Sequence, residues 1–284
     1  MKKIFRTLCL AVFTAVVALS AFTFTACGDT KDENKLYVGM ECGYMPFNYT
    51  QLDGSDDAVK ISNAPGYANG YDVMIAKKIA ENLGKELVIV KYEWNALVNA
   101  VETGALDFII AGMSPTAERL ESIDFSDAYY ESQLVIVVKE GGKYANATSL
   151  SDLSGANIVA QKGTFHDKAL NEQAAEYGIN RLTPMSSFPL MTSALKVGTI
   201  DGYVAEEPGA IADCAATEGL KYVPLINNST GFTVTAEDVQ IAVGIKKNSE
   251  LTAKVNEALA KITAAERAEM MNRAINLASG KNVQ

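Results

Sequence analysis

A hydroxyl residue, a proline and an arginine follow one another closely in residues 111–130, AGMSPTAERLESIDFSDAYY, and together they could bind an anion. The preceding ALDFIIAGM is apolar and β-branched enough to predict a buried strand. Ser114 is a good helix N-cap, and Pro115 suits the first helical position because its missing N–H costs nothing there. The main-chain N–H groups that would gather at the positive end of this helix are those of Ser114, Thr116 and Ala117.

Arg119 would lie about one turn into the helix, on roughly the face of Pro115 and Thr116, where it could reach back over these N–H groups. A guanidinium can hold a carboxylate by two parallel N–H bonds, so the stretch predicts a carboxylate site. The alternative is a surface arginine paired with Glu118 or Glu121, and the spacing alone leaves both open.

The histidine and cysteine content limits other chemistry. His166 is the only histidine, which excludes a multi-histidine metal site and allows a histidine-based triad only through this residue. Of the four cysteines, Cys9 lies in an apolar N-terminal run and Cys27 directly follows it, which leaves Cys42 and Cys214. These two are too few for a disulfide framework, and there is no Cys/His cluster, so we expect no metal and no cofactor.

The first 26 residues are predicted to be a targeting segment rather than part of the fold. MKKIFR is a short basic start, and LCLAVFTAVVALSAFTFTA is apolar and nearly long enough for a membrane span. A secretion signal is favoured because the run ends in small residues directly before Cys27. FTAC resembles a bacterial lipoprotein cleavage box, with Phe24 where leucine is more usual. We expect residues 1–26 to be removed, Cys27 to carry lipid such as palmitate, and residues 27–34 to be a tether; an ordinary signal cut at FTA is the alternative.

Acidic residues outnumber basic ones. The formal charge is −9, from 25 Lys and Arg against 34 Asp and Glu. Loss of Lys2, Lys3 and Arg6 with the signal would make it −12, because 22 basic residues would then face 34 acidic ones. Such a balance argues against nucleic acid and anionic membranes as partners. We therefore expect no nucleic-acid partner and an exported body that contacts the membrane through its lipid anchor only.

Strand and helix patterns alternate after the tether. Residues 35–40, 86–92 and 105–112 predict strands, and residues 71–84 and 94–104 predict helices, the first ended by Gly84. After a strand at 133–139 and a turn-rich stretch, the alternation begins again. This second series comprises strands at 156–161, 181–185, 201–207 and 221–225, helices at 167–177, 189–198 and 208–219, a strand at 239–247 and helices at 249–262 and 264–278. The alternation predicts two α/β lobes with mostly parallel sheets, in which ligands bind at the carboxyl ends of the strands.

Several blocks of the sequence together resemble a known family. They are VGMECGYMPFNY, GYDVMIAKKIAENLGK, EWNALVNAVETGALDFIIAGMSPTAERLESIDFSDAYY and DGYVAEEP. In this order they resemble the polar amino-acid-binding proteins of ABC importers, which are family 3 of the bacterial extracellular solute-binding proteins. The resemblance spans residues 35–278. It implies a two-lobed clamshell of the periplasmic-binding-protein type with two connecting strands, residues 35–132 and 231–280 forming one lobe and residues 133–230 the other.

The resemblance implies a role for each charged group. Arg119 of the T-x-x-R pattern would grip the α-carboxylate of a bound amino acid, with help from the N–H group of Ser114. The carbonyl of Gly112 would accept from the α-ammonium. Glu206 matches the acid that pairs with that ammonium, where many relatives carry Asp; the alternative is a surface acid beside Glu207.

The remaining expected contacts come from both lobes. QKGTFHD resembles the family's GT loop, which implies that Thr164 and the N–H of Phe165 meet the same carboxylate. A small or hydroxyl residue is frequent where Phe165 stands, so a backbone contact is expected there. Tyr44 and Trp94 match the aromatic residues that sandwich the ligand side chain. The expected ligand-binding set is completed by Glu41, Ala111, Met113 and Gln161.

Glu41 decides which ligand we expect. It lies three residues before Tyr44, and the matching family position often carries an Asp that points at the end of the ligand side chain. A carboxylate at the end of an aromatic-walled slot favours arginine or lysine, because Tyr44 and Trp94 would add cation–π attraction. Glutamine is the alternative, since its amide could donate to Glu41, and a pairing of Glu41 with a nearby lysine is the third interpretation.

The function expected from the resemblance is extracytoplasmic binding of a free L-amino acid by a monomer that delivers it to an ABC-transporter permease. We expect that the protein is not an enzyme. A dehydratase-like enzyme on the same fold is the main alternative, with Glu41 or Glu206 as its acid, but the sequence shows no nucleophile–base pair. A sensory lipoprotein that binds an amino acid as a signal is the other alternative.

Overall fold

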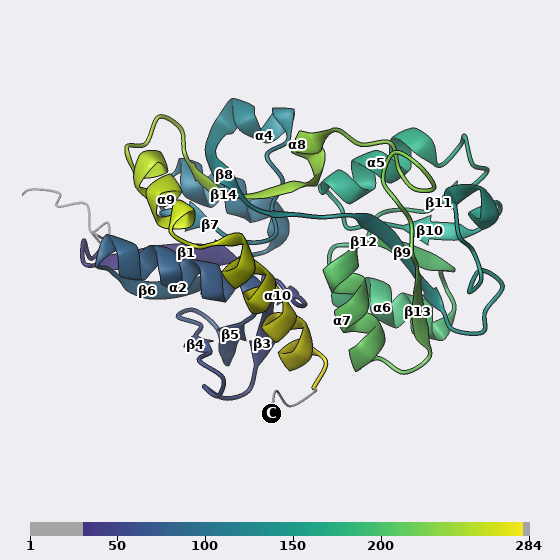
Figure 1. Cartoon of the computed structure of the whole chain (residues 1–284), viewed down its shortest axis with the longest axis horizontal. Helices are drawn as coiled ribbons and strands as arrows, with labels where there is room; N and C mark the ends of the chain where they lie inside the picture. Colours follow the sequence, from purple (N-terminus) through teal and green to yellow (C-terminus); the bar gives the residue numbers. More distant parts are fainter. Residues whose placement is uncertain (1–30, 281–284) are drawn as a thin grey trace, which may run out of the picture. The chain divides into compact units, whose positions relative to one another are not determined.

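The computed structural model describes residues 31–280. The predicted signal segment, its cleavage box and Cys27 therefore lie outside the described residues. From residue 34 onward the described chain contains three sheets, two of them flanked by helices (Figure 1).

The first sheet combines segments from both ends of this region in the order β6-β1-β7-β14-β8. Its parallel part consists of β6 (Glu86–Lys91), β1 (Lys35–Met40) and β7 (Phe108–Ile109). β14 (Gln240–Lys246) pairs antiparallel with β7 and with β8 (Ile123–Glu131). The accompanying helices are α2 (Tyr71–Leu83), α3 (Leu97–Glu102), α4 (Ala117–Ser122), α9 (Leu251–Ala260) and α10 (Ala264–Ala278).

The second sheet is formed by the middle of the chain in the order β11-β10-β12-β9-β13. β10 (Asn157–Val159) pairs in parallel with β11 (Asn180–Arg181) and β12 (Gly202–Glu206). β9 (Leu134–Lys139) pairs antiparallel with β12 and β13 (Leu220–Val223). The accompanying helices are α5 (Phe165–Gln173), α6 (Phe188–Val197) and α7 (Glu207–Ala216). The predicted α/β class is confirmed, with antiparallel pairings completing the parallel core of each sheet.

Both faces of the second sheet are buried, as β9 shows residue by residue. Leu134, Ile136 and Val138 pack in one hydrophobic cluster, whereas Val135 and Val137 pack in the other. Because successive side chains of a strand point to opposite faces, a sheet covered on both sides requires an uninterrupted apolar run. The sequence QLVIVVK supplies that run. The buried strand β9 pairs with β12 and so supports the end of β12 rigidly.

The chain passes between the two sheets twice. The first passage follows β8, and the N–H of Ser132 there donates to the carbonyl of Val239 in the returning segment (3.0 Å). The sequence predicts that the chain returns from the second lobe to the first at residue 231. Phe232 and Val239 are buried in a cluster of the second sheet, together with Leu134 and Val204. This packing favours a return near the start of β14 instead.

The third sheet is small and antiparallel, in the order β2-β3-β5-β4. Its strands are β2 (Gly43–Tyr44), β3 (Asn48–Gln51), β5 (Tyr67–Asn69) and β4 (Val59–Lys60). The sequence does not predict this sheet, because strands of only two to four residues are too short to show an alternating pattern. The sheet matters for the site, since β2 directly follows the turn that carries Glu41.

Helix ends follow the local sequence where capping residues are clear. Gly84 ends α2 as predicted, in the left-handed conformation (φ +65°), and its N–H donates to the carbonyls of Ala80 and Glu81. Glycine adopts this conformation without a steric penalty, so it is favoured directly after a helix. α10 begins at a capping box of Thr263 and Glu266.

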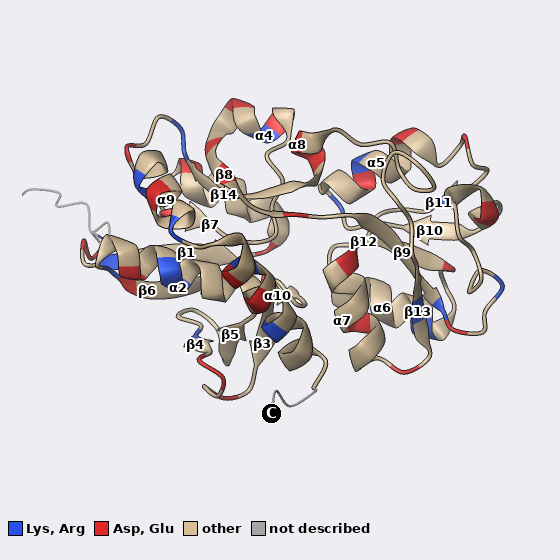
Figure 2. Cartoon of the chain, viewed as in Figure 1, with Lys and Arg blue, Asp and Glu red and all other residues tan. Residues whose placement is uncertain are grey.

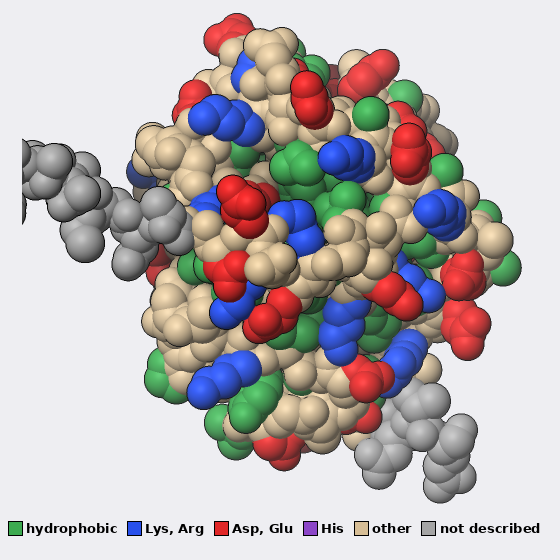
Figure 3. Space-filling model, turned by 90° about the vertical axis from the view of Figure 1, so that its left-hand side faces the viewer, with side chains coloured by type: hydrophobic (Ala, Val, Ile, Leu, Met, Phe, Trp, Pro, Cys, Tyr) green, Lys and Arg blue, Asp and Glu red, His purple; other side chains and the backbone are tan. Residues whose placement is uncertain are grey.

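Charged side chains of both signs are spread over the surface. Figure 2 shows Lys and Arg interspersed with Asp and Glu along the elements, and the face in Figure 3 shows the same mixture around apolar patches. On the faces drawn, charge therefore singles out no docking surface. Among the described residues, no helix combines the length and the apolar character needed to cross a membrane.

Candidate ligand-binding site

A small cavity lies where segments that follow the strands of the two sheets meet. Its volume is about 10 Å³, roughly the space of one water molecule. The residues that line it are Tyr44, Trp94, Gly112, Ser114, Arg119, Gln161, Thr164, Phe165, His166, Phe188 and Glu206. We call this the central cavity. An amino acid can enter it only if the surrounding segments move apart.

The central cavity gathers most of the residues that the sequence predicts for ligand binding. The predicted residues outside its lining are Glu41, Ala111 and Met113. Glu41 adjoins the cavity through its contact with Gln161, and Met113 lines a neighbouring pocket. Ala111 is buried and lines neither.

The helix that carries Arg119 begins later than predicted. The N-cap is Thr116, whose hydroxyl accepts from the N–H of Arg119 (3.4 Å), and α4 starts at Ala117. The prediction of Ser114 as N-cap and Pro115 as first helical residue is therefore wrong. Threonine is also a good cap, and the residue before a proline is kept out of helical conformations, so the chain stays outside the helix through Thr116.

The predicted cluster of main-chain N–H groups is also wrong at one position. The N–H of Thr116 donates to the carbonyl of Ser114 (2.9 Å) and is not available to an anion. The guanidinium of Arg119 reaches this same carbonyl, with Nη1 at 2.7 Å. The side chain of Ser114 is buried and lines the cavity.

Arg119 is a partly buried cation that faces carbonyl groups rather than a carboxylate. Its Nη2 donates to the carbonyl of Gly163 (3.0 Å), and its guanidinium carbon lies 5.1 Å from the centroid of the Trp94 ring. Within the described chain it forms no ion pair. Burial lowers the pKa of Arg119 to about 10, so the group stays charged at pH 7. The charge of Glu118 partly offsets this lowering, and a cation desolvated on one side would gain from an anion in direct contact.

The N-terminus of α5 lies opposite Arg119, on the side of the second sheet. Thr164 caps this helix, accepting from the N–H of Asp167 (3.3 Å) and donating to the carbonyl of Gln161 (2.7 Å). The helix begins at Phe165, two residues before the predicted start, because Thr164 is the effective cap. Phe165 and His166 are its first residues, and the N–H groups of a first helical turn have no partner within the helix. Such a terminus attracts carboxylates.

Glu206 and His166 form a buried pair at the second charged position. Glu206 ends β12 as the N-cap residue of α7, and its Oε1 lies 2.9 Å from Nε2 of His166. Their side chains are 5% and 7% exposed. Burial raises the pKa of Glu206 to about 8 and lowers the pKa of His166 to about 3, with a further decrease from the charge of Arg119. We therefore regard the pair as a neutral acid and a neutral imidazole at pH 7, not as an ion pair.

Glu41 lies directly after β1 and is held from the opposite sheet. Nε2 of Gln161 lies 3.0 Å from each of its carboxylate oxygens and also donates to the carbonyl of Ser186 (3.1 Å). Burial raises the pKa of Glu41, and the hydrogen bond from Gln161 opposes this shift. No lysine lies within ion-pair distance of Glu41 in the described structure, although the charge of Lys91 lowers the pKa of this carboxyl group. The third interpretation therefore keeps only this longer-range attraction.

A buried carboxylate behind the cavity fixes the segments that carry Glu41 and Gly112. Asp72 accepts from Nδ2 of Asn48 (2.8 Å) and from the hydroxyl of Tyr129 (2.7 Å). Oδ1 of Asn48 accepts from the N–H of Cys42 (2.8 Å), and the Tyr129 hydroxyl accepts from the N–H of Gly112 (3.3 Å). Burial raises the pKa of Asp72 to about 6. Asp72 thus supports both the segment that carries Glu41 and the segment that carries Gly112.

Gly112 is required where it stands. It adopts φ +62°, and a Cβ atom there would lie 3.1 Å from Cε1 of Tyr44. A side chain would be strained by the backbone conformation and would press on the ring. This close approach lets the chain turn beside the aromatic wall.

The aromatic wall differs from the predicted sandwich. The ring of Tyr44 stacks on Phe47 (centroids 5.0 Å apart) and on Phe188 (4.2 Å), so Phe188 covers the face expected to meet a ligand. Trp94 has Arg119 over its ring and donates through Nε1 to the carbonyl of Gly163 (3.0 Å). A ligand side chain held between Tyr44 and Trp94 would require Phe188 to move.

Two residues of the cavity, His166 and Phe188, were not predicted from the sequence. His166 is the second residue of the helix that Thr164 caps, which directs it toward the same cavity as the GT loop. Phe188 is the first residue of α6, after a serine N-cap and before Pro189. The single histidine and the Ser-Phe-Pro helix start were the available signals.

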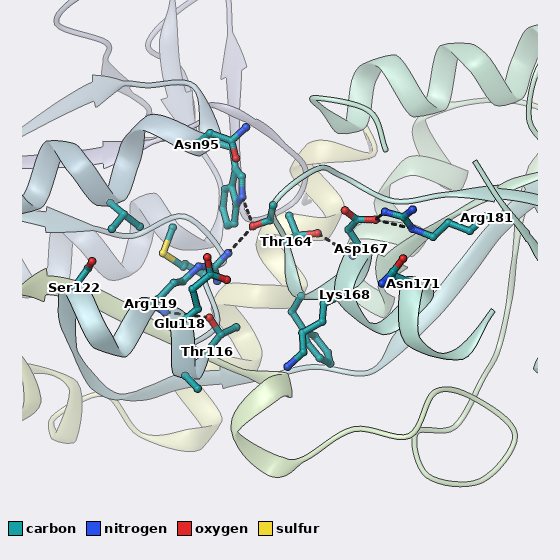
Figure 4. A pocket seen from close by; sticks show the side chains of 16 residues that line it. Asn95, Thr116, Glu118, Arg119, Ser122, Thr164, Asp167, Lys168, Asn171 and Arg181 are labelled. Atoms are coloured by element: carbon teal, nitrogen blue, oxygen red, sulfur yellow. Dashed lines mark hydrogen bonds and ion pairs between the residues drawn. The ribbon is translucent and has the colours of Figure 1, made fainter. Parts of the chain in front are cut away.

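A larger pocket adjoins the cavity and shares some of its residues (Figure 4). Its volume is about 590 Å³. Arg119, Trp94, Thr164 and Phe165 line both spaces. In Figure 4 the labelled side chains of α4 and α5 face each other across this pocket, with the Arg181–Asp167 ion pair (2.7 Å) on the α5 side. The shared residues make this pocket the natural approach to the cavity.

The two cysteines of the described chain are free thiols. Cys42 is buried and Cys214 is half-buried, and burial raises the pKa of each to about 12. Neither is therefore a thiolate at neutral pH. Within the described residues, no group of three or more His, Cys, Asp or Glu side chains could hold a metal ion.

Comparison with known proteins identifies the class. The sequence pattern of the bacterial extracellular solute-binding proteins, family 3, matches residues 36–275. The chain is 30% identical over 252 residues to the arginine-binding extracellular protein ArtP of Bacillus subtilis (strain 168), covering 86% of this chain and 89% of that protein. The chain therefore belongs to family 3 of the bacterial extracellular solute-binding proteins, which are binding proteins rather than enzymes.

Solved structures agree with this assignment. An amino acid ABC transporter substrate-binding protein from Streptococcus pneumoniae Canada MDR_19A, bound to L-arginine, is 27% identical with a TM-score of 0.73, covering 86% of this chain and 94% of that one. An ancestral arginine-binding protein bound to glutamine is 28% identical with a TM-score of 0.68, covering 85% and 98%. The predicted family and clamshell fold are confirmed.

Proposed function

We propose that this protein binds a free L-α-amino acid in the central cavity, with arginine favoured, and presents it to an ABC-transporter permease. The observation that carries the proposal is a cationic group and an unpartnered carboxyl oxygen that line one cavity. Among the described residues, Arg119 donates to carbonyls and forms no ion pair, and Oε2 of Glu206 is buried without a hydrogen-bond partner. A ligand carboxylate would give the cation a counter-ion and a ligand ammonium would give Oε2 a donor, so the two groups together indicate a zwitterion.

The two ends of an amino acid fit these two groups. The α-carboxylate would accept from Arg119 and from main-chain N–H groups at the start of α5. The hydroxyl of Thr164 could join them only by giving up its hydrogen bond to the carbonyl of Gln161. The α-ammonium would donate to Oε2 of Glu206 and to the carbonyl of Gly112. Each charge of the zwitterion then has a partner, as its transfer out of water requires.

The ligand side chain would extend toward Glu41. A guanidinium has several N–H donors and a permanent charge, and both favour a buried carboxylate. The hydroxyl of Tyr44 is buried without a partner among the described residues and offers a further contact. The arginine ligands of the relatives named above agree with this choice.

Glutamine is the second candidate, for a specific reason. The amide of Gln161 already donates to both oxygens of Glu41, which demonstrates that this carboxylate accepts an amide N–H. A ligand amide could replace it at similar geometry. The ancestral arginine-binding protein bound to glutamine shows that a relative accepts this amino acid.

Ligand binding would stabilise the closed arrangement of the two lobes. Arg119 and Glu41 belong to segments of the first sheet, whereas Glu206 and Thr164 belong to segments of the second. A ligand that contacts both sets has its full affinity only when they are close together, so it shifts the population toward closure. A permease could then distinguish loaded from empty protein, which we infer to be monomeric.

We also propose that the protein is exported and held to the membrane by lipid on Cys27. The motivation is the FTAC box after the apolar N-terminal run. Cell fractionation should recover the wild type with membranes and the Cys27→Ser protein largely in the medium or the soluble fraction. Equal membrane retention of the two proteins would count against the anchor.

Thermal denaturation of the purified protein with each common amino acid tests the binding function. At one hundred times Kd, a ligand adds about 2.7 kcal/mol, which for a chain of this size raises Tm by about 5–10 °C. We expect arginine to give the largest shift. No shift with any amino acid, together with a shift from a sugar or from an organic acid that lacks nitrogen, would overturn the proposal.

A further inference from the structure

The contact between His166 and Glu206 gives the ammonium-binding end of the cavity a feature that the expected contacts do not include. Nε2 of His166 lies 2.9 Å from Oε1 of Glu206, within hydrogen-bond distance. The imidazole is the second residue of α5, and the carboxyl group stands at the end of β12. Two separate elements of the second lobe therefore converge on this contact.

The other polar atom of each group has no partner. Oε2 of Glu206 and Nδ1 of His166 are both buried without a hydrogen bond among the described residues. The imidazole also meets the ring of Phe188 edge-on, with centroids 6.0 Å apart. The histidine is thus held in one orientation, and the carboxyl group has one oxygen engaged and one directed elsewhere.

One proton must lie between the two groups for a contact of this length. The charged and titratable groups that face the pair from the surrounding elements are Arg119 of α4 and Tyr44 of β2. Glu41 lies against Gln161 on the adjoining wall. An imidazolium would leave a charged Nδ1–H, and a carboxylate a charged Oε2, buried without a partner among the described residues. Burial and the charge of Arg119 act in the same direction, so a neutral acid beside a neutral imidazole is the favoured form.

An ammonium beside Oε2 would reverse this preference. It would stabilise the carboxylate form of Glu206, while Nε2–H of the neutral imidazole donates to Oε1. The carboxyl proton leaves to solvent, the ligand keeps its three ammonium protons, and the imidazole stays neutral as the Nε2–H tautomer. No other group has to change its charge.

We propose that His166 is the positioning residue for Glu206, holding one carboxylate oxygen so that the other meets the ligand's α-ammonium, and that binding releases the proton of this pair. The inference rests on the proposed amino-acid-binding function. It adds a specificity element, because a ligand without an ammonium group would have to leave the proton in place.

Titration calorimetry with arginine and with glutamine at pH 6.5 measures the proton directly. Buffers with different ionisation enthalpies give different observed heats, and their slope is the number of protons released. We expect about one proton per ligand for wild type and close to none for Glu206→Gln. Glu207→Gln should keep the release, which separates the neighbouring acid from the pair, and glutamine, which carries no cationic side chain, should release the same proton.

Two substitutions of His166 separate its hydrogen bond from its packing. His166→Phe keeps an aromatic ring against Phe188 and removes the donor, so arginine affinity should fall at least about tenfold. His166→Gln supplies a neutral N–H donor that can reach Oε1, and it should bind within about threefold of wild type. Glu207→Gln, which changes the neighbouring acid, is the matched control and should bind like wild type.

The outcomes distinguish this inference from the function on which it rests. If wild type binds no amino acid, the proposed function fails. If wild type binds arginine without releasing a proton, or if His166→Phe binds as well as His166→Gln, the positioning role fails while the function stands. Should His166→Phe not fold, the proton count of wild type and the affinity of His166→Gln still decide.

Discussion

Gln161 and Glu41 belong to segments of opposite sheets, and one amide nitrogen of Gln161 lies 3.0 Å from each carboxylate oxygen of Glu41. The contact joins the end of β1 to the segment after β10. It also occupies the carboxylate that we assign to the ligand side chain. A ligand side chain must therefore share Glu41 with this amide or displace it. Its affinity then depends on how strong a hydrogen bond its own N–H groups make to the carboxylate.

Glu41→Gln should change the order of ligand preference. A guanidinium gains a charge-assisted hydrogen bond to Glu41, worth about 1.5–3 kcal/mol, whereas an amide gains less. We expect the substitution to weaken arginine binding about tenfold or more and to change glutamine binding less than about threefold. Competition binding of arginine, lysine, glutamine and glutamate measures the order.

Glu93→Gln is the matched control for this prediction. Glu93 is exposed, and its charge acts on Glu41 without lining the cavity. Its substitution should leave the order unchanged. An unchanged order in Glu41→Gln would refute the assignment of Glu41 to the ligand side chain.

Arg119→Ala should abolish tight binding. It would leave the ligand carboxylate desolvated without its counter-ion, a loss of about 3–5 kcal/mol, or at least a hundredfold in Kd. Arg119→Lys keeps the charge but cannot hold a carboxylate by two parallel N–H bonds, so it should lose less, about tenfold. Calorimetric titration with arginine measures both.

Arg273→Ala is the control for Arg119. Arg273 is an exposed residue of α10 that pairs with Asp57. It should bind like wild type. A loss under about fivefold in Arg119→Ala would return Arg119 to the alternative of an ordinary surface residue.

The sequence predicted the elements well where each has a complete local signal. The apolar run of β9 and the Gly84 stop of α2 need no information from elsewhere in the chain, and both are found as expected. The start of α4 was predicted wrongly because Ser114 and Thr116 are both competent caps. Only the tertiary contacts of the segment decide between them.

The site could be predicted in composition but not in its pairings. Arg119, Glu206 and Gln161 were named from the sequence, and all line the cavity. The contacts of Gln161 with Glu41 and of His166 with Glu206 join residues at least 40 positions apart. No periodicity or spacing reports such contacts, and a lone histidine in a sequence gives no indication of its partner.

The stability of the protein should depend on pH through Glu206. Its pKa is about 8 in the fold, above the ordinary value of 4.5, so the folded state binds more protons than the unfolded chain between these values. The free energy of unfolding therefore falls as pH rises through this window. His166 has the opposite effect between about 3 and 6.5, because its pKa is lowered. Burial raises the pKa of Asp72 and of Asp213 to about 6, so both act in the same direction as Glu206, mainly at lower pH. Toward pH 8 the effect of Glu206 dominates.

Thermal denaturation without ligand should thus show Tm decreasing from pH 6.5 to pH 8. Glu206→Gln, which cannot ionise, should remove most of this decrease, and saturating arginine should oppose it by pairing with the carboxylate. A wild-type Tm that stays constant or rises over this range would show that Glu206 is ionised in the fold without ligand.

Phe188 should limit the affinity for a long side chain. Its ring stacks on Tyr44 with centroids 4.2 Å apart and planes 15° apart, which leaves no layer of space for a ligand between them. The ring must shift when a side chain takes that face of Tyr44, and its own packing opposes the shift. We expect Phe188→Leu to lower the free energy of unfolding by about 1–3 kcal/mol, yet to raise arginine affinity about two- to fivefold.

Phe232→Leu is the matched control, because Phe232 is also buried but lies in the separate cluster of the second sheet. This substitution should lower stability similarly and leave affinity unchanged. Weaker arginine binding in Phe188→Leu would mean instead that the ring contacts the ligand and belongs to the wall of the site.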